Sequence, residues 1–152
     1  MKRTYQILAA LLAVEVVLQA MAIAYGTAGL FRWVDKDGGV LNHAVVKNFE
    51  NDPPDFNGVG GFAFHGINGF MVTPLIALLF LVVAFFAKVE GGVRRAAVLL
   101  GMVILQVVLG IASHDVPLLA PLHVLVAFGI FTMAAMAAMA AASPTRSVGA
   151  SV

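Results

Sequence analysis

The sequence contains no cysteine and few charged residues. Without cysteine the chain can form no disulfide bond and no thiolate metal site. Only 11% of its 152 residues are charged, whereas 61% are hydrophobic and the mean hydropathy is +0.98. This apolar content exceeds what one small soluble core can bury, so we expect the protein to be embedded in a lipid bilayer.

The sequence also lacks the alternation of apolar and polar residues that is typical of membrane β-strands. The segment LIALLFLVVAFFA, residues 75–87, is apolar at every position. A membrane helix needs roughly 20 apolar residues, and four stretches are long enough: 5–30, 65–87, 96–113 and 118–142. The sequence therefore predicts an all-α membrane protein: a single domain over 1–152, built as a four-transmembrane-helix up-down-up-down bundle with an outer loop at 31–64.

Basic residues are distributed unevenly between the ends of these predicted helices. One side carries six of them: Lys2, Arg3, Lys88, Arg94, Arg95 and Arg146. The other side has three basic residues and six acidic ones: Arg32, Lys36, Lys47, Asp35, Asp37, Glu50, Asp52, Asp55 and Asp115. This bias predicts that both termini are cytoplasmic, in a prokaryotic plasma membrane. The basic residues form no stripe, so nucleic-acid binding has no support.

The N-terminus also has features of a cleavable signal peptide. Met-Lys-Arg precedes an apolar run that contains the small-residue pattern Ala22-Ile23-Ala24. The run is long for a signal peptide and contains Glu15 and Gln19. We therefore favour a retained first transmembrane helix.

Short motifs repeat between the two halves of the chain. VVLQA (16–20) in the first predicted helix resembles VILQV (103–107) in the third. His65 opens the second predicted helix and His123 opens the fourth. The pattern suggests two related hairpins, as in parallel repeats of membrane proteins.

The two histidines are expected to lie at the same depth, near the outer face. Both the interval from His65 to Lys88 and the interval from His123 to Arg146 are 23 residues long, and a helix rises by a constant amount per residue. In a four-helix ring the second and fourth helices are diagonal neighbours, so the two imidazoles can face each other.

Small residues follow each histidine one turn deeper, which leaves room for a flat macrocycle. They are Gly69 and Ala127, on the same helix faces as the histidines. Gln19 and Gln106, with Gly26 and Gly110, are expected to face the same cavity. Two neutral imidazoles on one metal favour haem, six-coordinate and suited to electron transfer. The alternative is that both histidines are interfacial residues hydrogen-bonded to loop carbonyls.

These motifs resemble a known family. LQVVLGIASHDVPLLAPLHVLVAFGIF (105–131) and FHGINGF (64–70) are similar to one four-helix half of haem A synthase, and to a family of small uncharacterised four-helix membrane proteins. The resemblance implies that His65 and His123 are axial ligands of one b-type haem. The catalytic half of haem A synthase has a glutamate and an arginine where this chain has Phe62 and Gly66. The resemblance is therefore closer to the half that holds the cofactor, and electron transfer or haem binding is favoured over haem modification.

The sequence contains other candidate groups and is compatible with other functions. His114, beside Asp115, is an alternative metal ligand with the two other histidines, for zinc or copper. Glu15 lies deep in the first predicted helix, either as a structural group bonded to a neighbouring helix or as a proton-relay or substrate-facing group. Alternative functions are a cofactor-free scaffold or accessory subunit, a small hydrophobic-solute transporter, or a haem-modifying enzyme active as a dimer. Besides the lipid bilayer, expected partners are a larger membrane oxidoreductase complex or a second copy.

Overall fold

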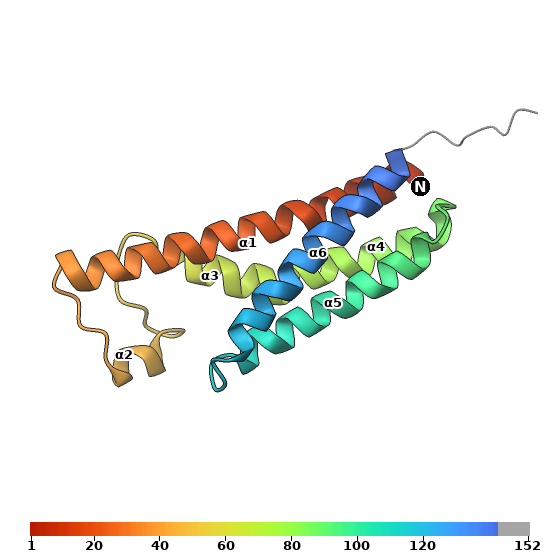
Figure 1. Ribbon diagram of the computed structural model, residues 1–152. Helices are drawn as coiled ribbons and strands as arrows, with labels where there is room; N and C mark the ends of the chain where they lie inside the picture. Colours follow the sequence, from red (N-terminus) through yellow and green to blue (C-terminus); the bar gives the residue numbers. More distant parts are fainter. Residues whose placement is uncertain (143–152) are drawn as a thin grey trace, which may run out of the picture. The chain divides into compact units, whose positions relative to one another are not determined.

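The computed structural model describes residues 1–142, and within this range all regular structure is helical. Four helical segments of this range are long and apolar enough to cross a membrane, which confirms the prediction of an all-α chain with four such helices (Figure 1). They are α1 (Lys2–Lys36), the continuous helix Val59–Ala87, α5 (Gly92–Ala112) and α6 (Leu119–Ala142). The second of them consists of α3 (Val59–Ile67), the π-helix η1 (Asn68–Val72) and α4 (Thr73–Ala87). Arg146, used in the charge and depth predictions, lies outside the described residues.

The outer loop is shorter than predicted. α1 continues to Lys36, and its 35 residues span about 52 Å, well beyond a hydrocarbon core of about 30 Å. The next long helix already begins at Val59, so the connection covers only 37–58. It contains the short helix α2 (His43–Asn48), and Asn42 caps α2 by accepting a hydrogen bond from Val45 N–H at 3.1 Å.

The chain divides into two compact units, which are described separately. Unit 1 consists of Met1–Ala13 and the chain from Ile76 onward, and unit 2 of Val14–Leu75. α1 and α4 each contribute to both units, because the boundaries fall inside these helices.

In unit 1, α5 and α6 pack against each other as a hairpin closed by the turn at 113–118 (Figure 1). At the opposite end the buried Tyr5 ring lies 4.5 Å from the Phe80 ring, and its hydroxyl donates to the Gly92 carbonyl at 3.5 Å. This contact brings the basic residues of two segments to the same end of unit 1, namely Lys2 and Arg3 with Arg94 and Arg95.

In unit 2, α1 and α3 approach closely through glycines, side by side in Figure 1. A Cβ on Gly61 would lie 2.3 Å from the Ala22 carbonyl oxygen and 2.9 Å from the Gly26 amide nitrogen. A Cβ on Gly26 would lie 3.0 Å from the Phe62 ring. Gly26, predicted to face the cofactor cavity, lies at this helix contact, where small residues let two helices approach closely.

An aromatic cluster fixes the loop of unit 2 to its helices. Phe56, which is 7% exposed, stacks on Trp33 of α1 with ring centroids 5.8 Å apart. Phe49 and Phe56 both meet Phe62 of α3, at 5.4 and 6.4 Å. Trp33 lies at the end of a helix longer than the bilayer, where aromatic residues are typical of the membrane interface.

We expect Phe56→Ala to loosen the loop without unfolding the helices. The substitution removes a buried ring that contacts Trp33, Phe49 and Phe62, so proteolytic cleavage within 37–58 should accelerate about 10-fold. Limited proteolysis in detergent measures this rate. Val46→Ala, at a position that is 59% exposed, is the control and should leave cleavage unchanged. Equal rates for both variants would show that the aromatic cluster does not hold the loop.

Candidate functional site

His123 is held by the main chain of the neighbouring helix in unit 1. Its Nδ1 lies 3.0 Å from the carbonyl oxygen of Gln106 on α5, and its side chain is half-buried. A Cβ on Gly110, one turn after Gln106, would lie 3.1 Å from Cε1 and 3.3 Å from Nδ1 of the imidazole. Gly110 therefore provides the space in which the His123 ring lies.

The side chain of Gln106 carries a buried oxygen that lacks a partner. Its Oε1 has no hydrogen bond within the described part of the chain. A buried amide oxygen normally accepts at least one hydrogen bond, so a water or a ligand group is expected to donate to it. This unsatisfied acceptor belongs to the same residue whose carbonyl orients His123.

His65 makes the same main-chain contact in unit 2. Its Nδ1 lies 3.3 Å from the carbonyl oxygen of Gln19 on α1, and its side chain is also half-buried. Each hairpin therefore pairs a histidine ring with the carbonyl of the glutamine in the repeated LQ motif. The sequence repeat predicted that these residues correspond, and the structure shows that they share one contact.

The Gln19 side chain bridges several groups of the second long helix. When the Gln19 amide is oriented with its oxygen toward Gly69, Oε1 accepts hydrogen bonds from Gly69 N–H at 2.9 Å and from Asn68 Nδ2 at 3.2 Å. Nε2 then donates to the His65 carbonyl at 3.1 Å and to His65 Nδ1 at 2.7 Å. In a regular α-helix, Gly69 N–H would donate a hydrogen bond to the His65 carbonyl. The Gln19 side chain contacts both of these groups. The opposite orientation of the Gln19 amide would place its NH₂ group against the donors of Gly69 and Asn68, so the orientation described above is favoured.

Asn68 links this glutamine to Glu15. Asn68 is 8% exposed, and its Nδ2 donates to Glu15 Oε2. This contact confirms the expectation that Glu15 is bonded to a neighbouring helix, and leaves its role as a relay or substrate-facing group as a hypothesis. Glu15, Asn68, Gln19 and His65 thus form one connected set of polar side chains inside unit 2, where lipid offers no alternative partners.

Neither the π-helix nor the role of Asn68 was predicted from the sequence. η1 begins at Asn68, and the hydroxyl of Thr73 donates to the Asn68 carbonyl at 3.2 Å. Pro74, which has no N–H to donate, was the signal for an irregular helix here. Single-turn π-helices are frequent at functional sites, because they change the direction in which nearby side chains point.

The other predicted residues have simpler surroundings. A Cβ on Gly69 would meet the Gln19 amide at 3.5 Å, and Ala127 is half-buried on α6. His114 is exposed, with its Nδ1 3.3 Å from the Ile111 carbonyl of its own helical turn. No group of three His, Cys, Asp or Glu that could hold a metal ion occurs within residues 1–142, so the zinc or copper alternative gains no support.

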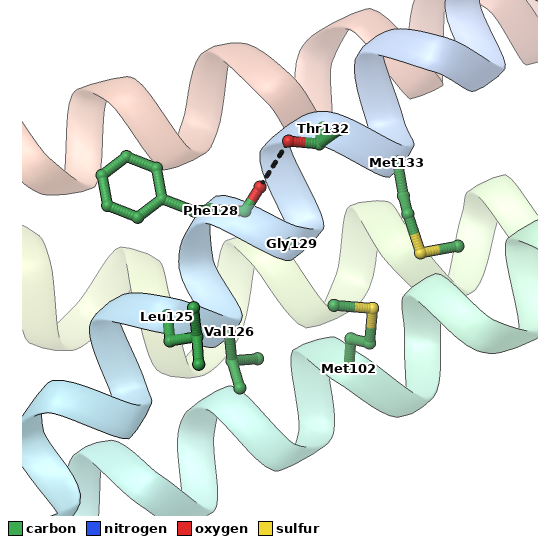
Figure 2. A pocket seen from close by; sticks show the side chains of 7 residues that line it. All are labelled: Met102, Leu125, Val126, Phe128, Gly129, Thr132 and Met133. Carbon is green, nitrogen blue, oxygen red and sulfur yellow. Dashed lines mark hydrogen bonds between the residues drawn. The ribbon is translucent and has the colours of Figure 1, made fainter.

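An apolar groove lies between α5 and α6 of unit 1, and its lining on α6 begins at Leu125, within one turn of His123. Figure 2 shows its lining, which includes Met102, Gly129, Thr132 and Met133. The Thr132 hydroxyl donates to the Phe128 carbonyl at 2.8 Å, so this polar group is already used within the helix. The groove, of about 510 Å³, offers a surface for an acyl chain rather than for a polar ligand.

The chemistry available at His65 and His123 is that of an oriented imidazole. At His65 the Gln19 amide nitrogen, 2.7 Å from Nδ1, favours the tautomer that carries its proton on Nε2. At His123 the Gln106 carbonyl oxygen only accepts, so a hydrogen bond from Nδ1 places the ring proton there and the lone pair on Nε2. Ligating histidines in metal proteins are usually held in this way. Comparison of the chain with protein-family models, with curated proteins and with solved structures found no match.

Proposed function

We propose that the chain is a membrane b-type cytochrome-like protein that binds one haem b through His65 and His123. The haem would lie near the outer face of the membrane and serve electron transfer or haem handling. The chain would form an up-down-up-down bundle, as in the half of haem A synthase that its motifs resemble.

One observation carries this proposal: the same histidine contact occurs in both units. His65 Nδ1 meets the Gln19 carbonyl and His123 Nδ1 meets the Gln106 carbonyl, at 3.3 and 3.0 Å. A histidine that ligates a metal through Nε2 usually donates its other ring N–H to a carbonyl or carboxylate, which fixes the ring and raises its basicity. Two histidines that each direct Nδ1 at the carbonyl of an LQ glutamine suit a cofactor with two axial positions.

The remaining residues also fit a haem. The buried Gln106 Oε1 can accept a hydrogen bond from a water or from a protonated group of the cofactor. Ala127 adds little bulk one turn from His123, whereas the space beside Gly69 holds the Gln19 amide. When bound, haem would supply a one-electron iron couple, and bis-histidine ligation would favour electron transfer over oxygen binding.

Charge supports the proposed orientation. The contact of Tyr5 with Gly92 brings basic residues of two segments to one end of unit 1, and such residues face the cytoplasm in membrane proteins. We therefore propose that both termini are cytoplasmic in a prokaryotic plasma membrane. The acidic loop at 37–58 would then face outward, toward a redox partner in a larger oxidoreductase complex or a second copy.

An absorption spectrum of the purified protein tests the proposal. After expression with ample haem, we expect the sharp reduced α band and Soret band of a low-spin bis-histidine haem at one haem per chain. His65→Ala and His123→Ala should each abolish this low-spin spectrum, because each removes one axial ligand.

His114→Ala is the matched control. His114 also directs Nδ1 at a main-chain carbonyl, but within its own helical turn and in an exposed position. Its substitution should leave the spectrum unchanged. A protein without haem bands after haem-replete expression would contradict the proposal and favour a cofactor-free scaffold, accessory subunit or transporter of hydrophobic solutes.

A further inference from the structure

We infer that unit 1 carries a binding site for one anionic phospholipid. Its headgroup phosphate would lie at Arg94 and Arg95, and one acyl chain would lie in the groove between α5 and α6. All residues of this site belong to unit 1. The inference goes beyond the proposed function, because neither the site nor its test depends on haem.

The groove offers apolar contacts over the length of an acyl chain. Figure 2 shows its wall on α6, from Leu125 at one end to Met133 at the other, and Met102 of α5 facing it. The Thr132 hydroxyl donates to the Phe128 carbonyl and so leaves no free donor in the groove. Leu125 and Met133 are eight residues apart, which corresponds to about 12 Å of helix. One leaflet, half of a hydrocarbon core of about 30 Å, has a similar thickness.

A second cavity continues the groove toward the basic end of unit 1. Its volume is about 350 Å³, and it is lined by Gly91, Arg94, Arg95, Val98 and Met133. Met133 lines both cavities, so they adjoin at this side chain. A lipid whose acyl chain lies in the groove would therefore have its polar end beside two guanidinium groups.

The two arginines can bind a phosphate. Within residues 1–142 neither Arg94 nor Arg95 forms an ion pair with a carboxylate. Arg94 is exposed, and Arg95 NH1 donates to the Glu90 carbonyl at 2.9 Å. This bond holds the Arg95 guanidinium beside Gly91, where a Cβ would lie 3.7 Å from Arg95 Cζ. A guanidinium has five N–H donors, so further donors can reach a phosphate.

The charge of this end of unit 1 favours an anionic ligand. The Tyr5–Gly92 contact joins the segments 1–13 and 88–95. Together they carry five basic residues and one acidic residue, namely Lys2, Arg3, Lys88, Arg94, Arg95 and Glu90. Basic pockets between membrane helices on the cytoplasmic side bind anionic headgroups. The proposed orientation places this end of unit 1 on that side.

Native mass spectrometry of the full chain with added lipid tests the inference. We expect one phosphatidylglycerol per chain, bound at least about 5-fold more tightly than phosphatidylcholine, the effect of one basic residue on an anionic lipid. Arg94→Gln alone should weaken phosphatidylglycerol binding about 5-fold, and Arg94→Gln with Arg95→Gln about 25-fold. An excess of glycerol phosphate, which has the headgroup chemistry without acyl chains, should not displace the lipid.

Arg32→Gln with Lys36→Gln is the control for charge. Both residues are exposed near the end of α1, and the double variant removes the same net charge as the two arginine substitutions. It should leave phosphatidylglycerol affinity unchanged. An equal loss of affinity in both double variants would overturn the inference, because it would show general attraction of an anionic lipid and no site at Arg94 and Arg95.

Gly129→Leu tests the acyl-chain part of the site. A Cβ on Gly129 would lie 2.7 Å from Met102 Cε, the flexible end of a side chain that can move aside, and the leucine would fill the groove. Phosphatidylglycerol affinity should fall about 4-fold or more, the loss for one methylene kept out of apolar contact. Gly101→Leu is the matched control, because Gly101 lines neither cavity and a Cβ there meets nothing within 4 Å in the described chain.

Three further results would overturn the inference. They are equal affinity for phosphatidylglycerol and phosphatidylcholine, displacement of the lipid by glycerol phosphate, and unchanged affinity in Gly129→Leu. Thermal unfolding of each variant, measured beside lipid binding, identifies any loss of fold, and the exposed Arg94→Gln variant tests the headgroup contact without altering a buried position. A chain that binds no haem but shows the expected lipid preferences would contradict the proposed function alone.

Discussion

A Gly61→Val variant is expected to lose about 3 kcal/mol of stability, because the added side chain has no room between α1 and α3. Its Cβ alone would lie 2.3 Å from the Ala22 carbonyl oxygen and 2.9 Å from the Gly26 amide nitrogen. Both contacts are with backbone, which cannot rotate away as a flexible side chain can. The helices must separate, and the packing of Phe62 against Gly26 is lost with them.

Gly60→Val is the matched control for this prediction. Gly60 is the preceding residue of α3, and a Cβ on it meets nothing within 4 Å in the described chain. Both variants place a β-branched residue in the first turn of the same helix, so intrinsic helix propensity cancels between them. Unfolding in detergent, followed by circular dichroism, compares the two. Equal stability of the variants would show that the close helix contact does not exist.

The same glycines explain why the sequence predicted the helices but not their ends. Long apolar runs identify membrane helices because lipid excludes unpaired backbone groups. Gly58, Gly60 and Gly61 suggested a loop, since glycine is typical of turns. Gly58 does adopt a left-handed conformation before α3, with φ of 110°. Gly61, however, lies inside α3 and serves packing against Ala22, a long-range contact that no local pattern reveals.

The candidate residues were predictable as types and positions, but not in their interactions. The LQ repeat and the two histidines are visible in the sequence, and each histidine meets the glutamine of its own hairpin. The contact that both histidines share is with a main-chain carbonyl, whereas the sequence predicted only that the two glutamines face the same cavity. Because every residue has a carbonyl, residue identity alone could not indicate this partner.

Lipid also explains why polar side chains gather in unit 2. Glu15, Asn68 and Gln19 would each be costly as isolated groups in a membrane. Asn68 joins the other two, by donating to Glu15 Oε2 and to Gln19 Oε1. Gln19 continues the series to His65 and to the backbone at the start of η1. The regular residue spacing of an α-helix would not predict this set of polar side chains. Asn68 lies at the start of the π-helix, where the α-helical spacing ends.

The position of the His123 ring depends on Gly110, and this dependence gives the second large prediction. Under the proposed haem-binding function, a Gly110→Val variant should bind haem about 10- to 100-fold more weakly than the wild type, the range seen when groups that orient a metal ligand are changed. The new Cβ would lie 3.1 Å from Cε1 and 3.3 Å from Nδ1 of His123, and the valine methyl groups would extend beyond it. The ring must then rotate away from the Gln106 carbonyl that fixes its tautomer.

Gly101→Val is the matched control for this prediction. Gly101 lies on the same helix, and a Cβ there meets nothing within 4 Å in the described residues, so the variant carries the same propensity penalty without touching His123. Haem content per chain, measured beside thermal unfolding, separates loss of the ring position from loss of the fold. If Gly110→Val kept a full complement of low-spin haem, the His123 ring orientation seen here would not be the one that binds iron. Loss of haem in Gly110→Val alone, at unchanged helix content, would instead show that His123 needs this space to act as a ligand.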